Sequence, residues 1–181
     1  LENHDTDRFL LEDPENLNVY KQAVTMLLTI PGIPQLYYGQ ELLMTGSTKK
    51  DFGYVRPDMP GGWNGDEISV FQESGRTAMQ QEAFNFMKKM LHWRKGNAAI
   101  SKGKMKHFMP RSNVYVYERS YNGKSILVIM NGVNKEVDLD LTFYKEVIGD
   151  RTNSKNVLTD SNVPLGKKLH LQPKEVLVLE L

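Results

Sequence analysis

The spacing of apolar residues predicts two helices in the first half of the chain. From Leu17 to Leu28 apolar side chains recur at intervals of three and four, which is typical of an amphipathic helix. Asp13-Pro14-Glu15 provides a cap, a first-turn proline and an acid for its start, and Pro31-Gly32 ends it. A second set with this spacing follows the capping box of Thr77–Gln80 and ends near Gly96-Asn97.

The segment between these helices has a different pattern. Residues 33–38, IPQLYY, are short, aromatic and uncharged, and Gly39 follows them. Such a run indicates a strand buried on both faces, as in a parallel sheet. Residues 40–76 are rich in glycine, lysine, aspartate and proline and show no clear period. A stretch of this length inside a compact domain is usually functional or disordered.

From about residue 104 the apolar period changes to two. Residues 114–121 and 124–130 flank Asn122-Gly123, which is a strong signal for a two-residue β-hairpin. Further apolar alternation or clustering occurs at residues 137–141, 168–171 and 176–179. We therefore expect an antiparallel β-sandwich from about residue 100 to residue 181.

A burial argument predicts that the first half is incomplete. A strand that is apolar on both faces needs neighbours on both edges, and a pair of helices cannot supply them. We expect residues 1–98 to be the last part of a larger α/β domain, with the remainder absent, and residues 99–181 to be a β domain of their own.

The composition limits the kinds of site and partner that the chain can have. The chain has 181 residues, no cysteine and a net charge of +1. Disulfides, thiolate catalysis and cysteine-based zinc sites are excluded, and nothing suggests a nucleic-acid partner. No apolar run approaches the ~18 residues of a membrane span. The remaining histidines, His92, His107 and His170, have no partner at metal-ligand spacing, and no metal site is predicted.

The first ten residues, LENHDTDRFL, concentrate polar chemistry in Asn3-His4-Asp5. Taken alone, this tripeptide is most simply a solvated tail or an N-cap cluster. Residues 32–41, GIPQLYYGQE, follow after roughly one helix and two loops, which is the length of a βα unit. The family resemblance that these two motifs carry together favours contact with a substrate instead.

Together these two motifs resemble consecutive strands of the (β/α)8 barrel of the α-amylase family of glycoside hydrolases, family 13. The resemblance places Asn3-His4-Asp5 at the end of the seventh strand and residues 32–41 at the eighth. The β module then looks like the family's C-terminal domain. The loop RPDMPGGWNGD at residues 56–66 is similar to neopullulanases and cyclomaltodextrinases, and neopullulanases of starch-utilisation systems look closest.

The resemblance implies a retaining enzyme that cleaves α-1,4-glucosidic bonds in starch, maltooligosaccharides, pullulan or cyclodextrins. The family's nucleophile and acid lie on strands outside this chain, so the fragment alone is expected to be inactive. Asp5 corresponds to the third carboxylate, which stabilises the transition state, and His4, Asn3, Arg56 and Trp63 are expected to bind substrate. No cofactor is expected in this chain, although the parent enzyme could hold calcium. The family resemblance favours a periplasmic or extracellular location.

Several residues keep a second interpretation. Asp7 and Arg8 are expected to form a local ion pair that fixes the loop, and Asn3 could position the backbone. Trp63 either stacks on a glucose face or packs its own loop against the barrel, and Arg56 either lines an outer subsite or pins the loop. Glu41 is more simply a structural carboxylate than a catalytic one.

A rival hypothesis assigns the function to residues 100–181 as a non-catalytic carbohydrate-binding or interaction module. Tyr115, Tyr117 and Tyr121 lie on one face of a predicted strand and could form a flat platform for sugars. Inward packing explains three aromatic residues on one face equally well.

Overall fold

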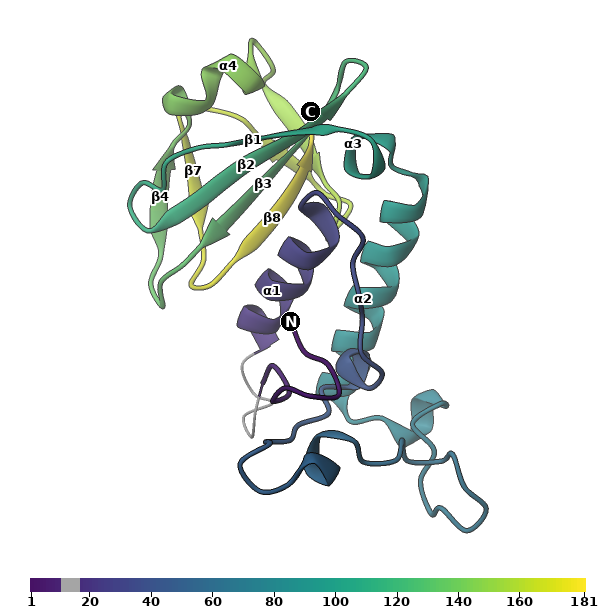
Figure 1. Cartoon of the computed structure of the whole chain (residues 1–181). Coiled ribbons are helices and arrows are strands. Elements are labelled where there is room, and N and C mark those ends of the chain that lie inside the picture. Colours follow the sequence, from purple (N-terminus) through teal and green to yellow (C-terminus); the bar gives the residue numbers. More distant parts are fainter. Residues whose placement is uncertain (11–16) are drawn as a thin grey trace. The chain divides into compact units, whose positions relative to one another are not determined.

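The computed structural model describes residues 1–10 and 17–181, which form two compact units (Figure 1). The first unit comprises residues 1–24 and 33–88, and the second comprises residues 25–32 and 89–181. The helices are α1 (Leu17–Thr29), α2 (Ala78–Gly96), α3 (Ala98–Ser101) and α4 (Lys145–Ile148). The strands are β1 (Lys104–His107), β2 (Val114–Tyr121), β3 (Lys124–Asn131), β4 (Val137–Asp140), β5 (Asn153–Asn156), β6 (Asn162–Pro164), β7 (Lys168–Leu171) and β8 (Val176–Glu180).

Both predicted helices are present. The capping box before α2 is confirmed, because the Gln80 backbone N–H donates to Thr77 Oγ1 (3.2 Å) and the Thr77 N–H donates to Gln80 Oε1 (2.9 Å). α2 ends at Gly96, as expected. α1 ends at Thr29, just before Pro31-Gly32, whereas its predicted start at Asp13-Pro14-Glu15 lies outside the described residues.

The predicted buried strand at residues 33–38 is wrong. This segment belongs to no sheet, and Ile33 is 98% exposed. A strand needs a neighbour to complete its hydrogen-bond ladder, and the described part of the first unit contains no other strand. The unit is instead built from the two helices, loops and three short 3-10 turns: Gln40–Leu42, Phe52–Val55 and Glu73–Gly75.

The predicted hairpin in the second unit is confirmed. β2 pairs antiparallel with β3 from Val114↔Asn131 to Tyr121↔Lys124. Asn122 and Gly123 both adopt left-handed backbone angles, with φ values of 48° and 78°. Two such residues make a turn whose twist matches that of the flanking strands.

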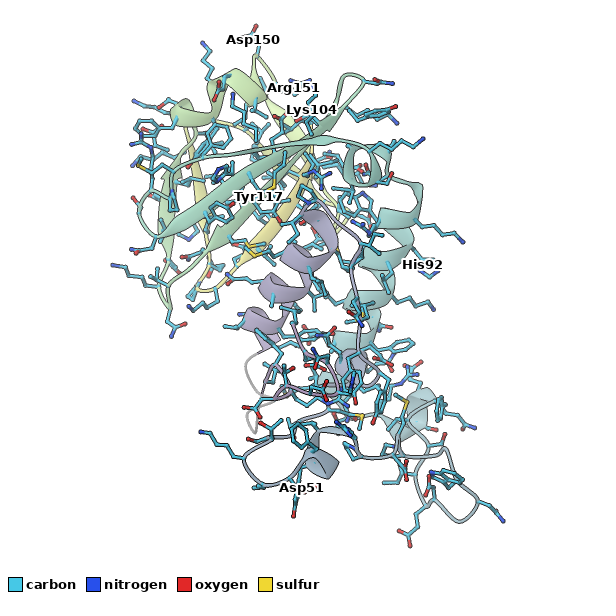
Figure 2. The ribbon with its side chains drawn as sticks, viewed as in Figure 1. Asp51, His92, Lys104, Tyr117, Asp150 and Arg151 are labelled. Carbon is cyan, nitrogen blue, oxygen red and sulfur yellow. The ribbon has the colours of Figure 1, made fainter. Side chains whose placement is uncertain are left out.

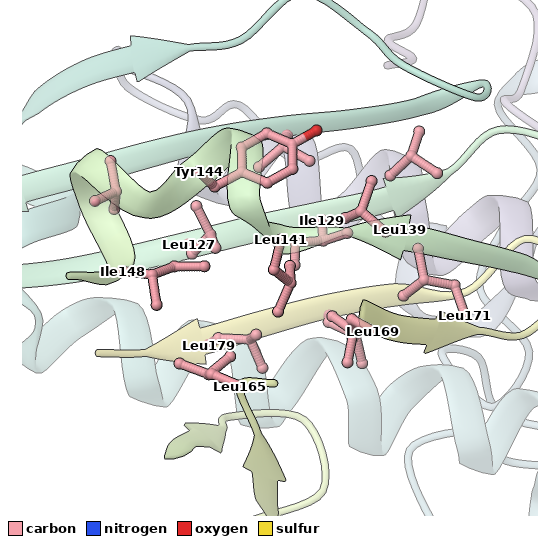
Figure 3. Packing of buried hydrophobic residues seen from close by; sticks show 14 residues of the cluster. Leu127, Ile129, Leu139, Leu141, Tyr144, Ile148, Leu165, Leu169, Leu171 and Leu179 are labelled. Atoms are coloured by element: carbon pink, nitrogen blue, oxygen red, sulfur yellow. The ribbon is translucent and has the colours of Figure 1, made fainter. Parts of the chain in front are cut away.

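The second unit is an antiparallel β-sandwich, also as predicted (Figure 1). One sheet has six strands in the order β1-β2-β3-β8-β5-β6, and the other pairs β4 with β7. A single apolar cluster fills the space between the sheets (Figure 3). Leu139, Leu169 and Leu171 of the smaller sheet meet Leu127 and Leu179 of the larger one in this cluster.

The central strand β3 is buried on both faces, which explains its unbroken apolar sequence. Leu127 and Ile129 point into the sandwich core. Ile126, Val128 and Met130 point to the opposite face and are also buried. On that face the hydroxyl of Tyr117 in β2, labelled in Figure 2, forms a hydrogen bond with the Thr29 hydroxyl at the end of α1. The period of two is therefore visible in the outer strands and lost in the central one.

A buried arginine joins helix ends to this second face. Arg119 of β2 is 2% exposed and donates to the Thr29 carbonyl (2.5 Å) at the end of α1. It also donates to the carbonyls of Ile100 (2.9 Å) and Gly103 (2.8 Å) at the end of α3. The carbonyl ends of helices carry partial negative charge, so they stabilise a cation that has no carboxylate partner. Burial nevertheless lowers the pKa of Arg119, and the charge of Arg94 adds to this effect.

Candidate functional site

Asn3 folds the polar N-terminal segment into a tight turn. The Asp5 backbone N–H donates to Asn3 Oδ1 (2.7 Å), and the Asn3 N–H donates to Thr6 Oγ1 (3.0 Å). An asparagine that accepts from the backbone two residues later is a standard way to close a turn. The contacts of Asn3 are therefore those of a residue that positions the loop backbone.

The turn presents the Asp5 carboxylate to solvent between two basic side chains. His4 Nε2 lies 3.1 Å from Asp5 Oδ2, and Arg56 Nη2 lies 3.0 Å from Asp5 Oδ1. Arg56 Nε also donates to the His4 carbonyl (2.8 Å). The Asp5 side chain nonetheless keeps 61% of its surface exposed. We call Asn3, His4, Asp5 and Arg56 the Asp5 cluster; four of the five predicted site residues thus lie together.

The expected ion pair between Asp7 and Arg8 is wrong. Arg8 is completely buried and pairs with Glu2, whose Oε1 lies 3.0 Å from Arg8 Nη1. Asp7 instead accepts hydrogen bonds from the backbone and hydroxyl of Thr48. These bonds favour the ionised carboxylate and lower the pKa of Asp7. The buried Glu2 carboxylate offsets the desolvation of Arg8, whereas Asp7 lies closer to the surface.

Arg8 braces the segment that carries Asp5. Its Nη1 donates to the Tyr38 carbonyl (2.6 Å) and its Nε donates to the Val55 carbonyl (3.1 Å). Glu2 Oε2 accepts from the Phe9 N–H (2.7 Å), so the two ends of the Asp5 segment are tied together. The Val55 contact also fixes the chain immediately before Arg56. Glu2 and Arg8 therefore hold both halves of the Asp5 cluster in place.

The rings of Tyr37 and Tyr38 both lie against the guanidinium of Arg8. The Arg8 guanidinium lies 4.1 Å from the centre of the Tyr37 ring and 4.9 Å from that of Tyr38. The Tyr38 hydroxyl donates to the Pro57 carbonyl (2.8 Å), which links it to the loop after Arg56. Both rings therefore help to hold Arg8 in place through cation–π contacts.

Trp63 is the predicted site residue that does not join the Asp5 cluster. It is 67% exposed, and its backbone N–H donates to Asp66 within its own loop. Asp66 closes its loop by accepting from the backbone N–H groups of Gly61 (2.6 Å) and Trp63 (3.1 Å). The loop that carries Trp63 is therefore held by hydrogen bonds to Asp66, and the exposed indole does not anchor it.

The three-tyrosine platform of the rival hypothesis is not present. Tyr117 is fully buried and its hydroxyl bonds to Thr29, while Tyr115 and Tyr121 are partly buried. Inward packing is therefore the correct interpretation of Tyr117.

Sequence reasoning missed Glu2 altogether and gave Arg8 the wrong partner. A weak signal was available, because Glu2 follows Leu1 and Arg8 precedes Phe9 and Leu10. Charged residues in an apolar context are either paired or functional. Their separation of six residues matches no regular element, so only the folded loop identifies the pair.

Residues 1–10 and 17–181 contain no group of three or more histidine, cysteine, aspartate or glutamate side chains arranged to hold a metal ion. In the same part of the chain, no helix has the length and apolar character needed to cross a membrane.

Comparisons with known proteins agree on one group of enzymes. Residues 105–180 match the cyclo-malto-dextrinase C-terminal domain family. Over 171 residues, 90% of this chain, the sequence is 32% identical to a cyclomaltodextrin glucanotransferase from Bacillus sp. (strain 6.6.3). Over 179 residues, 98% of this chain, it is 28% identical to a cyclomaltodextrinase from Thermoanaerobacter pseudethanolicus. The chain spans only 21% and 27% of these two relatives.

The structural neighbours include α-amylases, a debranching enzyme and a trehalulose synthase. The α-amylase from H. orenii superposes on 99% of this chain with a TM-score of 0.74 and 25% identity, and the match covers 38% of that protein. Similarity therefore extends across both compact units, beyond the residues that match the family of C-terminal domains.

Proposed function

We propose that this chain is the C-terminal part of a retaining glycoside hydrolase that acts on α-1,4-glucosidic bonds of starch, maltooligosaccharides, pullulan or cyclodextrins. Residues 1–98 would complete a (β/α)8 barrel, and residues 99–181 would form the β domain behind it. The names of the relatives and the alignment over 98% of the chain support this proposal. Residues 33–38 would become a strand only beside strands contributed by the rest of the barrel.

The observation that carries the proposal is the Asp5 carboxylate. It is exposed to solvent, Arg56 contacts it, and the Glu2–Arg8 pair holds the segment that bears it. A retaining glycosidase passes through an oxocarbenium-like state, and its nucleophile and acid would come from other segments of the parent. Asp5 would hold hydroxyls of the distorted sugar, and His4 would donate to the same ring. The buried Glu2–Arg8 pair and Arg56 fix the carboxylate before substrate arrives, which is the preorganisation that transition-state stabilisation requires.

The loop at residues 56–66 supports a neopullulanase-like or cyclomaltodextrinase-like subtype. Arg56 contacts Asp5 directly, whereas Trp63 presents an exposed ring at the other end of the same loop. A ring in that position suits the apolar C–H face of a glucose unit in an outer subsite. Calcium, where the parent needs it, would be held by segments beyond these residues.

The test uses the full-length protein that contains this chain. Asp5→Asn keeps the size of the side chain and removes its charge, so kcat on maltohexaose should fall about 10²–10³-fold. Asp150→Asn removes an exposed carboxylate of the second unit and is the matched control, with unchanged turnover expected. Near-normal turnover by a folded Asp5→Asn enzyme would refute the proposed role. The isolated chain should show no turnover.

A further inference from the structure

The second unit contains a cavity of about 460 Å³ that the proposed activity does not use. It lies where β3 begins and β8 ends, at the paired residues Ile126 and Glu180, and the end of α2 forms its opposite wall. Its volume falls within the ~300–1,000 Å³ typical of small-ligand sites. None of its lining residues belongs to the Asp5 cluster.

An oriented aromatic ring forms one wall of this cavity. Trp93 of α2 donates its indole N–H to Glu180 Oε1 (2.8 Å), which fixes the plane of the ring. The residue is only partly buried. A fixed indole with accessible ring surface can pack against the C–H face of a sugar without losing further side-chain entropy on binding.

Polar groups of both hydrogen-bonding types surround the ring. Glu180 keeps a second carboxylate oxygen as an acceptor. Asn97 uses its oxygen to accept from the Ala99 N–H (3.0 Å) at the start of α3, so its amide nitrogen is left to donate. Lys124 adds an exposed ammonium. Sugar hydroxyls both donate and accept, and this set can satisfy both roles.

The charges of the lining residues favour an uncharged ligand. Among the side chains that line the cavity, Glu180 supplies one carboxylate and Lys124 one ammonium, so these two formal charges cancel. An anion would face Glu180 and a cation would face Lys124, whereas a neutral polyhydroxylated ring meets neither penalty.

We infer that this cavity, which we call the Trp93 pocket, is a non-catalytic site for one or two glucose units of an α-glucan. The identity of the sugar rests on the proposed function, whereas the cavity and its lining do not. Such a site would keep a long glucan attached to the protein between turnovers at the Asp5 cluster, through a gain in effective concentration.

The test is maltohexaose binding to the whole 181-residue chain, followed through its two tryptophan indole N–H signals in a ¹⁵N-labelled sample. Trp63→Phe assigns the two signals. Gly96→Leu then fills the Trp93 pocket, since a Cβ at Gly96 meets no atom within 4 Å and the residue keeps ordinary backbone angles. Gly166→Leu is the matched control, because its Cβ meets only one atom, at 4.0 Å, and it does not line the pocket.

We expect maltohexaose to shift the Trp93 signal, Gly96→Leu to weaken this binding about tenfold or more, and Gly166→Leu to leave it unchanged. Lys124→Ala, which removes an exposed side chain without touching the core, should weaken it less. A shift of the Trp63 signal alone, no shift of either signal, or equal binding by Gly96→Leu would each overturn the inference. None of these results bears on the Asp5 assay, which measures turnover of the full-length protein.

Discussion

The two compact units of this protein provide hydrogen-bond partners for their backbones in different ways. The second unit uses sheets, whose ladders and apolar cluster are made from its own residues. The first unit has no sheet among its described residues and relies on loops tied by buried polar groups such as Glu2 and Arg8. Buried side-chain atoms without a hydrogen-bond partner occur in both units among the described residues. They are Arg8 Nη2, Tyr20 Oη and Gln40 Oε1 in the first unit and Thr25 Oγ1 and Tyr144 Oη in the second. Comparing the units shows that an ordered site does not require regular secondary structure, although such a site should be easier to open.

The largest expected difference between the units is in hydrogen exchange. Amides of β3, paired on both edges, should exchange about a thousandfold more slowly than those of residues 37–60 in the isolated chain. Exchange followed by mass spectrometry on peptides from each unit measures this ratio. Equal protection in the two units would show that the loops of the first unit are as stable as the sandwich.

The next largest difference is expected in how much stability each unit loses when a buried leucine is replaced by alanine. Leu171 is fully buried in the sandwich cluster, so Leu171→Ala should cost about 4 kcal/mol and lower the melting temperature of the second unit. Leu42→Ala removes a similarly buried residue from the first unit and should leave that transition nearly unchanged. Urea melts monitored by circular dichroism of the sheet compare the two. A large loss of sheet stability in Leu42→Ala would mean that the units unfold together.

The two buried arginines provide a smaller contrast. Arg119→Met leaves helix-end carbonyls without a donor and should destabilise the second unit by about 3 kcal/mol. Arg8→Met leaves Glu2 as an unpaired buried carboxylate and should loosen the first unit while the sheet melts normally. Differential scanning calorimetry of the two variants tests this. A sheet transition lowered as much by Arg8→Met as by Arg119→Met would contradict it.

The smallest expected effect is on how the stability of the second unit depends on pH. His170 Nδ1 lies 2.9 Å from Asp138 Oδ1, and this bond, aided by Glu136 and Glu175, raises the pKa of His170 above 6.5. The stabilisation is complete below pH 6.5 and is lost as pH rises through the raised pKa. Lys168 also faces Asp138. Thermal melts of the wild type and His170→Gln should therefore converge as pH rises, and added salt should reduce the difference at low pH.

In the first unit, the stability should depend on pH in the opposite sense, with a loss at low pH. Thr48 lowers the pKa of Asp7 below 3.8, so the contribution of this carboxylate is present above that pH and is lost as pH falls through the lowered pKa. Asp7→Asn should flatten the acid limb of stability for the first unit and leave the alkaline limb unchanged. Melts at low pH, followed by tryptophan fluorescence, test this. An unaltered acid limb in the variant would assign the dependence to another group.

Local signals predicted most of the second unit and the helices. The capping box at Thr77–Gln80 and the turn at Asn122-Gly123 require only a few consecutive residues, so the sequence specifies them directly. Residues 33–38 misled the prediction, because their apolar character describes an environment that the described chain does not provide. The sequence pointed to Asp5 and His4 as candidate site residues, but it did not predict the Arg8–Glu2 pair that holds their segment.

The sequence by itself determined which segments could become helix, hairpin or turn, and that the acidic residues near the start were candidates for chemistry. Those properties depend on neighbours a few positions apart. Only the tertiary structure decided that Arg56 lies against Asp5, 51 positions away, and that Arg8 pairs with Glu2 while Asp7 turns to Thr48. It also decided that Arg119 caps helices from within a sheet. Burial and charge pairing depend on proximity in space, which local sequence patterns do not encode.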